Sequence, residues 1–132
     1  MSNTENRTFT ATIIASSFEM TPIEKVKFKD TNDAVALDQA TSEKPLIIQP
    51  KGWVKLHIHN EKSDDKDYEN FIIVDSNGQR YKTGSASFVN SFMDIWEELE
   101  EATENGEEWF LKIYQSPSKN YAGRNFLSCC VA

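Results

Sequence analysis

Aromatic and positively charged side chains gather near the end of this 132-residue chain, in a stretch without any acidic residue. The stretch SPSKNYAGRNF, residues 116–126, contains Lys119, Tyr121, Arg124 and Phe126. A cation can bind a phosphate and an aromatic ring can stack on a nucleobase, so the combination is typical of surfaces that bind single-stranded nucleic acid. The same residues could also form an ordinary turn between two strands.

A segment earlier in the chain, KGWVKLHIHN (residues 51–60), combines the same residue types. Side chains alternate across a strand, so this segment has one aliphatic face and a second face of rings and cations. The strand expected at residues 108–115 likewise places Phe110, Lys112 and Tyr114 on one face. An alternative is that the rings pack against a helix or a partner subunit. The candidate residues for binding a single strand are Trp53, Lys55, His57, His59, Lys112, Tyr114, Lys119, Tyr121, Arg124 and Phe126.

Each type of candidate residue has a different expected role. A ring stacked on a base contributes about 1–3 kcal/mol, and a lysine or arginine meets the phosphates between the bases. The imidazoles of His57 and His59 would add positive charge at lower pH. The expected stacking residues are Trp53, Tyr114, Tyr121 and Phe126, and the expected phosphate contacts are Lys55, Lys112, Lys119 and Arg124.

Charge is distributed unevenly along the chain. The whole sequence holds 21 Asp and Glu against 14 Lys and Arg, a net charge of −7. Residues 61–108 hold fourteen acidic and four basic side chains, whereas residues 109–132 hold three basic and no acidic side chains. Binding of a polyanion depends on the local field rather than on the total charge, so the acidic total does not exclude it. The acidic segment also permits another function, a protein-interaction module or DNA mimic that binds a basic protein partner.

Little in the sequence favours a metal site, a cofactor or catalysis. The HIH segment places His57 and His59 on the same side of a strand, which is half of a metal site, but no CxxC or HxxxH partner accompanies it. The sequence contains no GxSxG, no Gly-rich phosphate loop and no HExxH. We therefore expect a protein that is not an enzyme and has no cofactor.

Composition and cysteine use predict a cytoplasmic protein. Hydrophobic residues make up 39% of the chain, which suffices for a folded core. No stretch approaches the roughly 20 apolar residues that span a bilayer, and the start, MSNTENRT, does not resemble a secretion signal. The cysteines, Cys129 and Cys130, are neighbours, and adjacent cysteines rarely bridge each other.

Strands are expected over much of the first half of the chain. Residues 8–16, TFTATIIAS, are rich in Thr and Ile, which favours a strand. The alternation at Lys25–Lys29 indicates a short edge strand, with mostly connector after it. Residues 45–60 should form two extended pieces broken at residues 50–52, and an acidic loop should follow at residues 61–70.

The next signals predict a hairpin and a helix. Asn77-Gly78 follows an apolar run and favours a tight hairpin turn. Ser85 or Ser87 can cap the start of the helix and Asn105-Gly106 can end it. Apolar residues then recur at the spacing of one buried helical stripe. This stripe contains Phe88, Phe92, Ile95, Trp96, Leu99 and Ala102.

Two closing strands complete the expected order, at about residues 108–115 and 124–131. Three extended segments, a helix and two strands are the order of an OB-fold, which is mostly β with one α-helix between strands 3 and 4 of a five-stranded barrel. A two-layer α+β sandwich is the alternative. We expect one OB-like domain over residues 1–132, with residues 1–7 disordered.

Three motifs in the second half of the chain carry a resemblance to a known family. They are a D-x-x-G hairpin, a Y-x-T-x-S turn into an aromatic-rich helix, and a closing hairpin with K-x-Y and G-R-x-F-L, all within roughly residues 68–131. This pattern resembles small single-stranded-DNA-binding proteins carried by plasmids, conjugative elements and phages of Gram-positive bacteria. The resemblance implies an OB-fold that binds single-stranded DNA during replication or transfer of a mobile element.

These observations together predict a protein that coats single-stranded DNA with little sequence preference and performs no chemistry. RNA is an alternative ligand, and self-association along the DNA is a further expectation. No membrane contact is expected.

Overall fold

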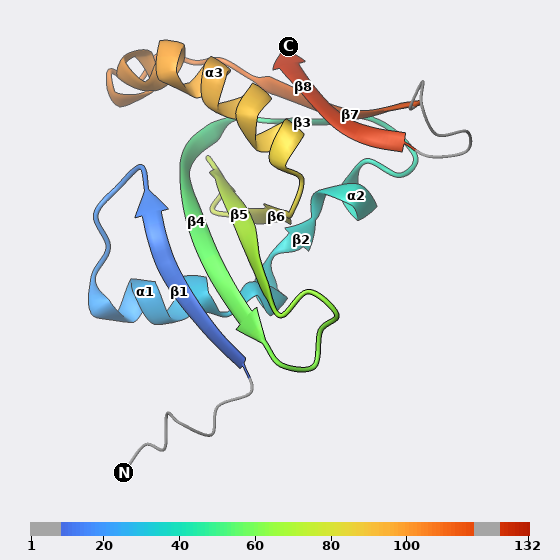
Figure 1. Cartoon of the computed structure of the whole chain (residues 1–132). Coiled ribbons are helices and arrows are strands. Elements are labelled where there is room, and N and C mark those ends of the chain that lie inside the picture. Colours follow the sequence, from blue (N-terminus) through green and yellow to red (C-terminus); the bar gives the residue numbers. More distant parts are fainter. Residues whose placement is uncertain (1–8, 118–124) are drawn as a thin grey trace.

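The strands of the computed structural model, which describes residues 9–117 and 125–132, form two sheets (Figure 1). The larger sheet has the strand order β1-β4-β5-β6-β2, and the smaller has the order β3-β7-β8. The strands of the larger sheet are β1 (Phe9–Ser16), β2 (Val35–Ala36), β4 (Pro50–Asn60), β5 (Asp67–Asp75) and β6 (Arg80–Thr83). The strands of the smaller sheet are β3 (Leu46–Ile48), β7 (Leu111–Pro117) and β8 (Asn125–Val131).

The described residues form more helices than the single helix that the sequence predicts. The described residues form α1 (Pro22–Lys29), α2 (Leu37–Ala40) and α3 (Ala86–Glu104), with a 3₁₀ turn, η2, at Thr31–Asp33. None of these helices is long and apolar enough to cross a bilayer. The expected helix is confirmed as α3, but the expectation of a single helix is wrong.

Helix α1 replaces the edge strand predicted at Lys25–Lys29. Thr21 accepts a hydrogen bond from the Glu24 backbone N–H, and the Glu24 carboxylate accepts one from the Thr21 N–H. This reciprocal capping box, with Pro22 at the first turn, favours helix initiation. The local start signal outweighs an alternation of only five residues.

Both ends of α3 lie where the sequence predicts them. The Ser85 hydroxyl accepts a hydrogen bond from the Phe88 N–H, and the helix ends at the C-cap Asn105. Gly106 follows with a φ of 82°, a conformation that glycine adopts without strain. Within the apolar stripe, Phe88, Phe92 and Trp96 are buried.

The predicted hairpin joins β5 to β6. Gly78 has a φ of 82°, and Asp75 stabilises the turn because its carboxylate accepts hydrogen bonds from the backbone N–H groups of Asn77 and Gln79. The other end of β5 differs from the expectation. It begins at Asp67, inside the stretch predicted as an acidic loop.

One continuous run of chain joins the two sheets. Strand β3 pairs antiparallel with β7, and after Gln49 the chain continues as β4, which pairs antiparallel with both β1 and β5. The predicted break at residues 50–52 is a β-bulge inside β4 instead. Gly52 allows a close approach there, because a Cβ at this position would lie 2.8 Å from the Phe18 ring.

The chain is mostly β, as predicted, but the five-stranded closed barrel is wrong, because the strands divide into two sheets that do not close. One core lies between the larger sheet, α3 and the smaller sheet, around Phe71, Phe92 and Leu111. A second core lies on the opposite face of the larger sheet, where Leu56 and Ile72 are covered from the side of α1. Residues 17–44, which have little sequence pattern, supply this additional cover.

Candidate nucleic-acid interface

The smaller sheet has one buried face and one solvent-facing face. Its inner side chains, among them Ile48, Leu111 and Leu127, belong to the main core. The register pairs Ile47 with Lys112 and Lys112 with Cys130 across the three strands, so these side chains share the opposite face. We call this the outer face. Its residues are Ile47, Phe110, Lys112, Tyr114, Ser116, Phe126, Ser128 and Cys130.

Aromatic rings are accessible on the outer face. Phe110 and Phe126 keep 43% and 45% of their surfaces exposed, and the Lys112 ammonium lies 5.6 Å from the centroid of the Tyr114 ring. Phe110 precedes β7, and its carbonyl accepts a hydrogen bond from the Ala132 N–H, which fixes it beside the end of β8. Strand alternation places Phe110 and Ile47 on this face, although the candidates chosen from the sequence do not include them.

The outer face has no acidic side chain among the described residues. Strands β3, β7 and β8 contain no Asp or Glu, and Lys112 is their one charged residue. The candidates Lys119, Tyr121 and Arg124 lie outside the described residues, as does the predicted disorder of residues 1–7. Of the sequence candidates, the structure thus brings together Lys112, Tyr114 and Phe126 on an acid-free surface.

Trp53, a predicted stacking residue on β4, is partly buried and packs against the main core instead. Its ring stacks on Phe71, with the ring centroids 5.4 Å apart, and the Phe71 ring in turn contacts Phe92 of α3. The indole N–H of Trp53 is buried and has no hydrogen-bond partner within the described part of the chain. One face of the Trp53 ring is therefore occupied by Phe71, at the end of β4 where the main core lies.

The remaining β4 candidates are paired with acidic residues of β5 and its loop. Lys55 lies 4.0 Å from Glu69, and the His57 Nε2 lies 3.0 Å from the Asp67 carboxylate. His59 lies between two carboxylates, since its Nδ1 is 2.9 Å from Asp67 and its Nε2 is 2.7 Å from Glu61. The positive charge predicted on this face is thereby neutralised by carboxylates from the neighbouring strand and loop.

These pairs shift the acidity of the groups that form them. Hydrogen bonds to Asp67 and then Glu61 raise the pKa of the His59 imidazole above its ordinary value of 6.5. Hydrogen bonds from His59 and then His57 lower the pKa of the Asp67 carboxyl. Hydrogen bonds from His59 and then Lys66 lower the pKa of the Glu61 carboxyl. Both ring nitrogens of His59 face carboxylate oxygens, which favours the doubly protonated imidazolium.

The histidines do not form a metal centre in this arrangement. Within residues 9–117 and 125–132, no group of three or more His, Cys, Asp or Glu side chains has a geometry that could hold a metal ion. Cys129 faces the main core, and burial, followed by the neighbouring Cys130, raises the pKa of its thiol to about 11. Cys130 is exposed on the outer face, beside Lys112 in the strand register.

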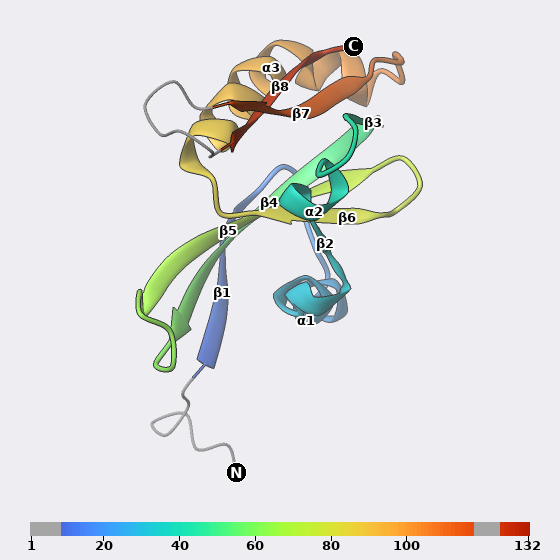
Figure 2. The same ribbon diagram turned by 90° about the vertical axis from the view of Figure 1, so that its right-hand side faces the viewer.

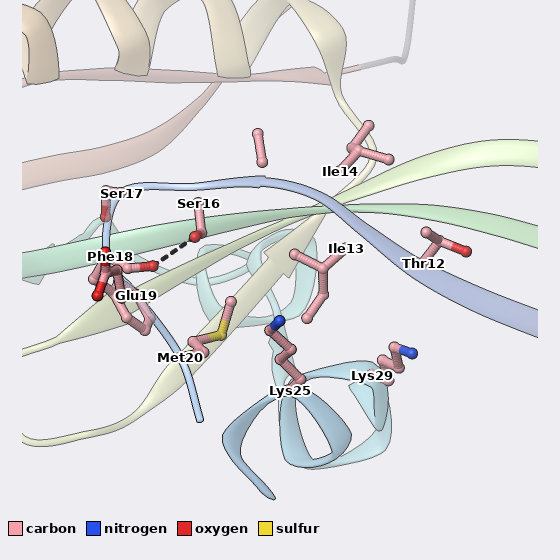
Figure 3. A pocket seen from close by; sticks show the side chains of 11 residues that line it. Thr12, Ile13, Ile14, Ser16, Ser17, Phe18, Glu19, Met20, Lys25 and Lys29 are labelled. Carbon is pink, nitrogen blue, oxygen red and sulfur yellow. Dashed lines mark hydrogen bonds between the residues drawn. The ribbon is translucent and has the colours of Figure 1, made fainter. Parts of the chain in front are cut away.

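Two cavities lie away from the outer face. The larger, about 880 Å³, lies between β1 and α1, and Figure 3 shows Lys25 and Lys29 extending toward it from the helix. The smaller, about 430 Å³, lies at the start of α3 and is lined by Lys55, Glu69 and Phe71 among others. Neither cavity is lined by a described residue of the smaller sheet.

No protein-family model, no curated protein and no solved structure matches this chain.

Proposed function

We propose that this protein binds single-stranded DNA, with little sequence preference, through the outer face of the smaller sheet. The observation that carries the proposal is the composition of that face. It presents the rings of Phe110, Tyr114 and Phe126 with the ammonium of Lys112, and its described residues include no carboxylate.

The physical basis is stacking combined with phosphate contacts. A ring that stacks on a base contributes about 1–3 kcal/mol whatever the base, because every base has a π-face. Lys112 supplies a positive charge beside the Tyr114 ring. The sequence adds Lys119, Tyr121 and Arg124 in the connection between β7 and β8. This mixture favours binding without sequence readout, because no base-edge contact is needed.

The path of the chain supports an OB-like arrangement, in an open rather than closed form. Strands β4, β5 and β6 are consecutive antiparallel neighbours, α3 follows them, and the β7–β8 hairpin returns to pair with β3. OB-folds bind oligonucleotides with a strand face and with the loop between their last two strands. In this chain that loop is the connection at residues 118–124.

The biological setting of the proposal depends on the resemblance of residues 68–131 to the proteins of plasmids, conjugative elements and phages. We propose that the protein acts in the replication or transfer of such an element and performs no catalysis. Within the described residues, Lys112 is the one charged side chain of the smaller sheet and forms no ion pair, which agrees with a binding role.

Fluorescence anisotropy of a labelled single strand tests this proposal. A strand of about 30 nucleotides, long enough for at least one OB-fold site, is titrated with the protein at two salt concentrations, with the duplex as a comparison. We expect binding to the single strand that weakens as salt rises, because phosphate contacts release counterions.

Alanine variants assign the binding to the outer face. Tyr114→Ala and Phe126→Ala should each weaken binding by about 1–3 kcal/mol if the ring stacks on a base. Phe9→Ala is the matched control, since Phe9 is a similarly exposed ring (47%) on β1 of the larger sheet. Absence of binding by the wild type at low salt would contradict the function, and equal loss in all three variants would contradict the site. If the protein does not bind single-stranded DNA, the exposed acidic side of α3 becomes the candidate surface for binding a basic protein.

A further inference from the structure

Helix α1 exposes apolar side chains on its solvent side. Ile23 and Val26 keep 70% and 69% of their surfaces exposed, and none of the residues of α1 is buried. They are three positions apart and therefore neighbours on one side of the helix. The opposite side is held against the larger sheet by Phe28, whose ring lies 5.7 Å from that of Phe18 and under the Arg80 guanidinium.

Lysines flank this apolar pair. At 100° per residue, Lys27 lies on one flank of Ile23 and Val26 and Lys29 lies on the other. Lys25 and Lys29 also line the cavity between α1 and β1, where one carboxylate, that of Glu19, is a neighbour (Figure 3). In the part of the chain that the structure describes, none of the three lysines lies within 4.0 Å of a carboxylate.

Helix α3 has the opposite character on its solvent side. Its exposed residues there include no cation, and its last turn contains no basic residue that would interact favourably with the negative end of the helix dipole. None of these acids forms an ion pair with a described residue. The exposed acidic residues are Asp94, Glu97, Glu98, Glu100, Glu101 and Glu104.

The two helices lie on opposite faces of the larger sheet, α3 with the main core and α1 with the second core. Figures 1 and 2, which are related by a quarter turn about the vertical axis, both show α3 above the larger sheet and α1 lower down, near β1. A contact between α1 of one copy and α3 of the next joins different surfaces, so a row of joined copies keeps one free surface of each kind at its ends. Contacts of this type build rings or open filaments rather than closed dimers.

We propose that α1 of one copy docks on the acidic side of α3 of a second copy, and that this contact aligns copies along a bound single strand. Lys27 and Lys29 pair with Glu97 and Glu101 of the neighbouring copy, while Ile23 and Val26 lie against the methylene groups of those glutamates. The alignment rests on the proposed function, because the strand brings the copies together. The contact between the helices is independent of the strand.

The contact is expected to be weak in free solution and effective on DNA. It joins exposed ion pairs and two apolar side chains, and exposed ion pairs contribute little individually. A strand that holds two copies side by side raises the local concentration of each surface, so the same contact then strengthens binding of successive copies. Longer strands should therefore be bound more tightly per copy than short ones.

Charge reversal on either helix tests the contact on DNA. The variants K27E/K29E and E97K/E101K are compared on (dT) strands of about eight nucleotides, enough for one copy, and about 60 nucleotides, enough for several. We expect each variant to lose roughly tenfold in affinity for the long strand and to bind the short strand as the wild type does. The variant with all four changes should recover the affinity, because its charges are again complementary.

The control variant K44E/K51E removes the same positive charge elsewhere on the surface, since both lysines are exposed. An equal loss of affinity for the long strand in this control would overturn the proposal. So would a variant with four changes that does not recover that affinity. Melting temperatures close to that of the wild type would establish that each variant remains folded.

Carbodiimide cross-linking separates this proposal from the proposed function, because it needs no DNA. The reagent joins a lysine amine to a glutamate carboxylate with loss of water, and a mixture of ¹⁴N- and ¹⁵N-labelled protein identifies links between copies by mass spectrometry. We expect mixed-isotope peptides that join Lys27 or Lys29 to Glu97 or Glu101. If these peptides are absent at high protein concentration and low salt, the contact between the helices is overturned, even if the protein binds DNA. If they are present, the contact is supported, even if the protein does not bind DNA.

Discussion

Two regions of this molecule have nearly the same composition and opposite surroundings. Both the outer face of the smaller sheet and one side of β4 combine aromatic rings with lysine or histidine. On the outer face, Phe110 and Phe126 are exposed and the described residues add no carboxylate. On β4, Trp53 packs against the main core, and Lys55, His57 and His59 face Glu61, Asp67 and Glu69. A strand's own residues therefore do not decide whether it can bind an anion.

The neighbouring strand makes the difference. The antiparallel register pairs His57 with Glu69 and His59 with Asp67, so each imidazole of β4 lies beside a carboxylate of β5. Opposed pairs across two strands interact most strongly in a sheet. The partners of Lys112 across the smaller sheet are Ile47 and Cys130, which leave its charge available to a ligand.

The largest effect that separates the two regions should come from truncating a ring in each. Trp53→Ala should lower the free energy of unfolding by about 3 kcal/mol, because it removes the stacking partner of Phe71 and leaves a cavity in the main core. Phe126→Ala should change it by about 0.5 kcal/mol, as expected at an exposed position. Urea denaturation of both variants measures the difference. Equal destabilisation would contradict the assignment of Trp53 to the core and of Phe126 to the surface.

A smaller effect should follow from reversing one lysine in each region. Lys112→Glu should weaken single-strand binding roughly tenfold and lower the slope of the salt dependence by about 1, since one phosphate contact is lost. Lys55→Glu should leave both quantities nearly unchanged, because Glu69 already offsets the charge of Lys55. Anisotropy titrations at several salt concentrations measure both. Greater loss in Lys55→Glu than in Lys112→Glu would reverse the assignment of the two surfaces.

The smallest effect concerns the dependence of stability on pH. The raised pKa of His59 makes its pairing stabilising below pH 6.5, and this contribution is lost as the pH rises through the pKa of the folded protein. The lowered pKa values of Asp67 and Glu61 make their contributions complete above their ordinary values of 3.8 and 4.5, and these are lost on acidification. The cluster should therefore stabilise the fold most between pH 4.5 and pH 6.5.

Asp67→Asn tests this pH dependence, because it removes the largest cause of the shift at His59. NMR titration of the imidazole protons should show the pKa of His59 falling toward its ordinary value in the variant. An unchanged pKa would mean that the hydrogen bond between His59 and Asp67 does not form in solution.

Much of the second half of the fold could be predicted because its signals are local. The turn at Asn77-Gly78, the cap at Ser85 and the stop at Asn105-Gly106 each act within a few residues. The first half was harder for two reasons. The capping box that starts α1 is local but competes with the alternation at Lys25–Lys29, and other elements depend on tertiary contacts. The Arg80 guanidinium donates hydrogen bonds to the Lys27 carbonyl and to Asp33, and Lys82 donates to the Thr31 carbonyl, which connects β6 to segments about 50 residues away.

The candidate site was predictable in part, because side-chain alternation along a strand is also a local signal. Alternation along one strand placed Lys112 and Tyr114 on one face, and the register of β7 and β8 adds Phe126 to that face. Alternation also identified the two faces of β4, but it could not show that both are covered at the end near Trp53. That fact depends on α3 and the smaller sheet, which pack on β4 from distant parts of the sequence.

Amide NMR spectra recorded during titration with a (dT) strand of about eight nucleotides, roughly the length that one OB-fold site binds, test the central claim most directly. Our account predicts that the largest shifts occur at Phe110, Lys112, Tyr114 and Phe126, while Lys55 and its neighbours on β4 change little. Shifts concentrated on β4 and β5, with the outer face unaffected, would contradict it.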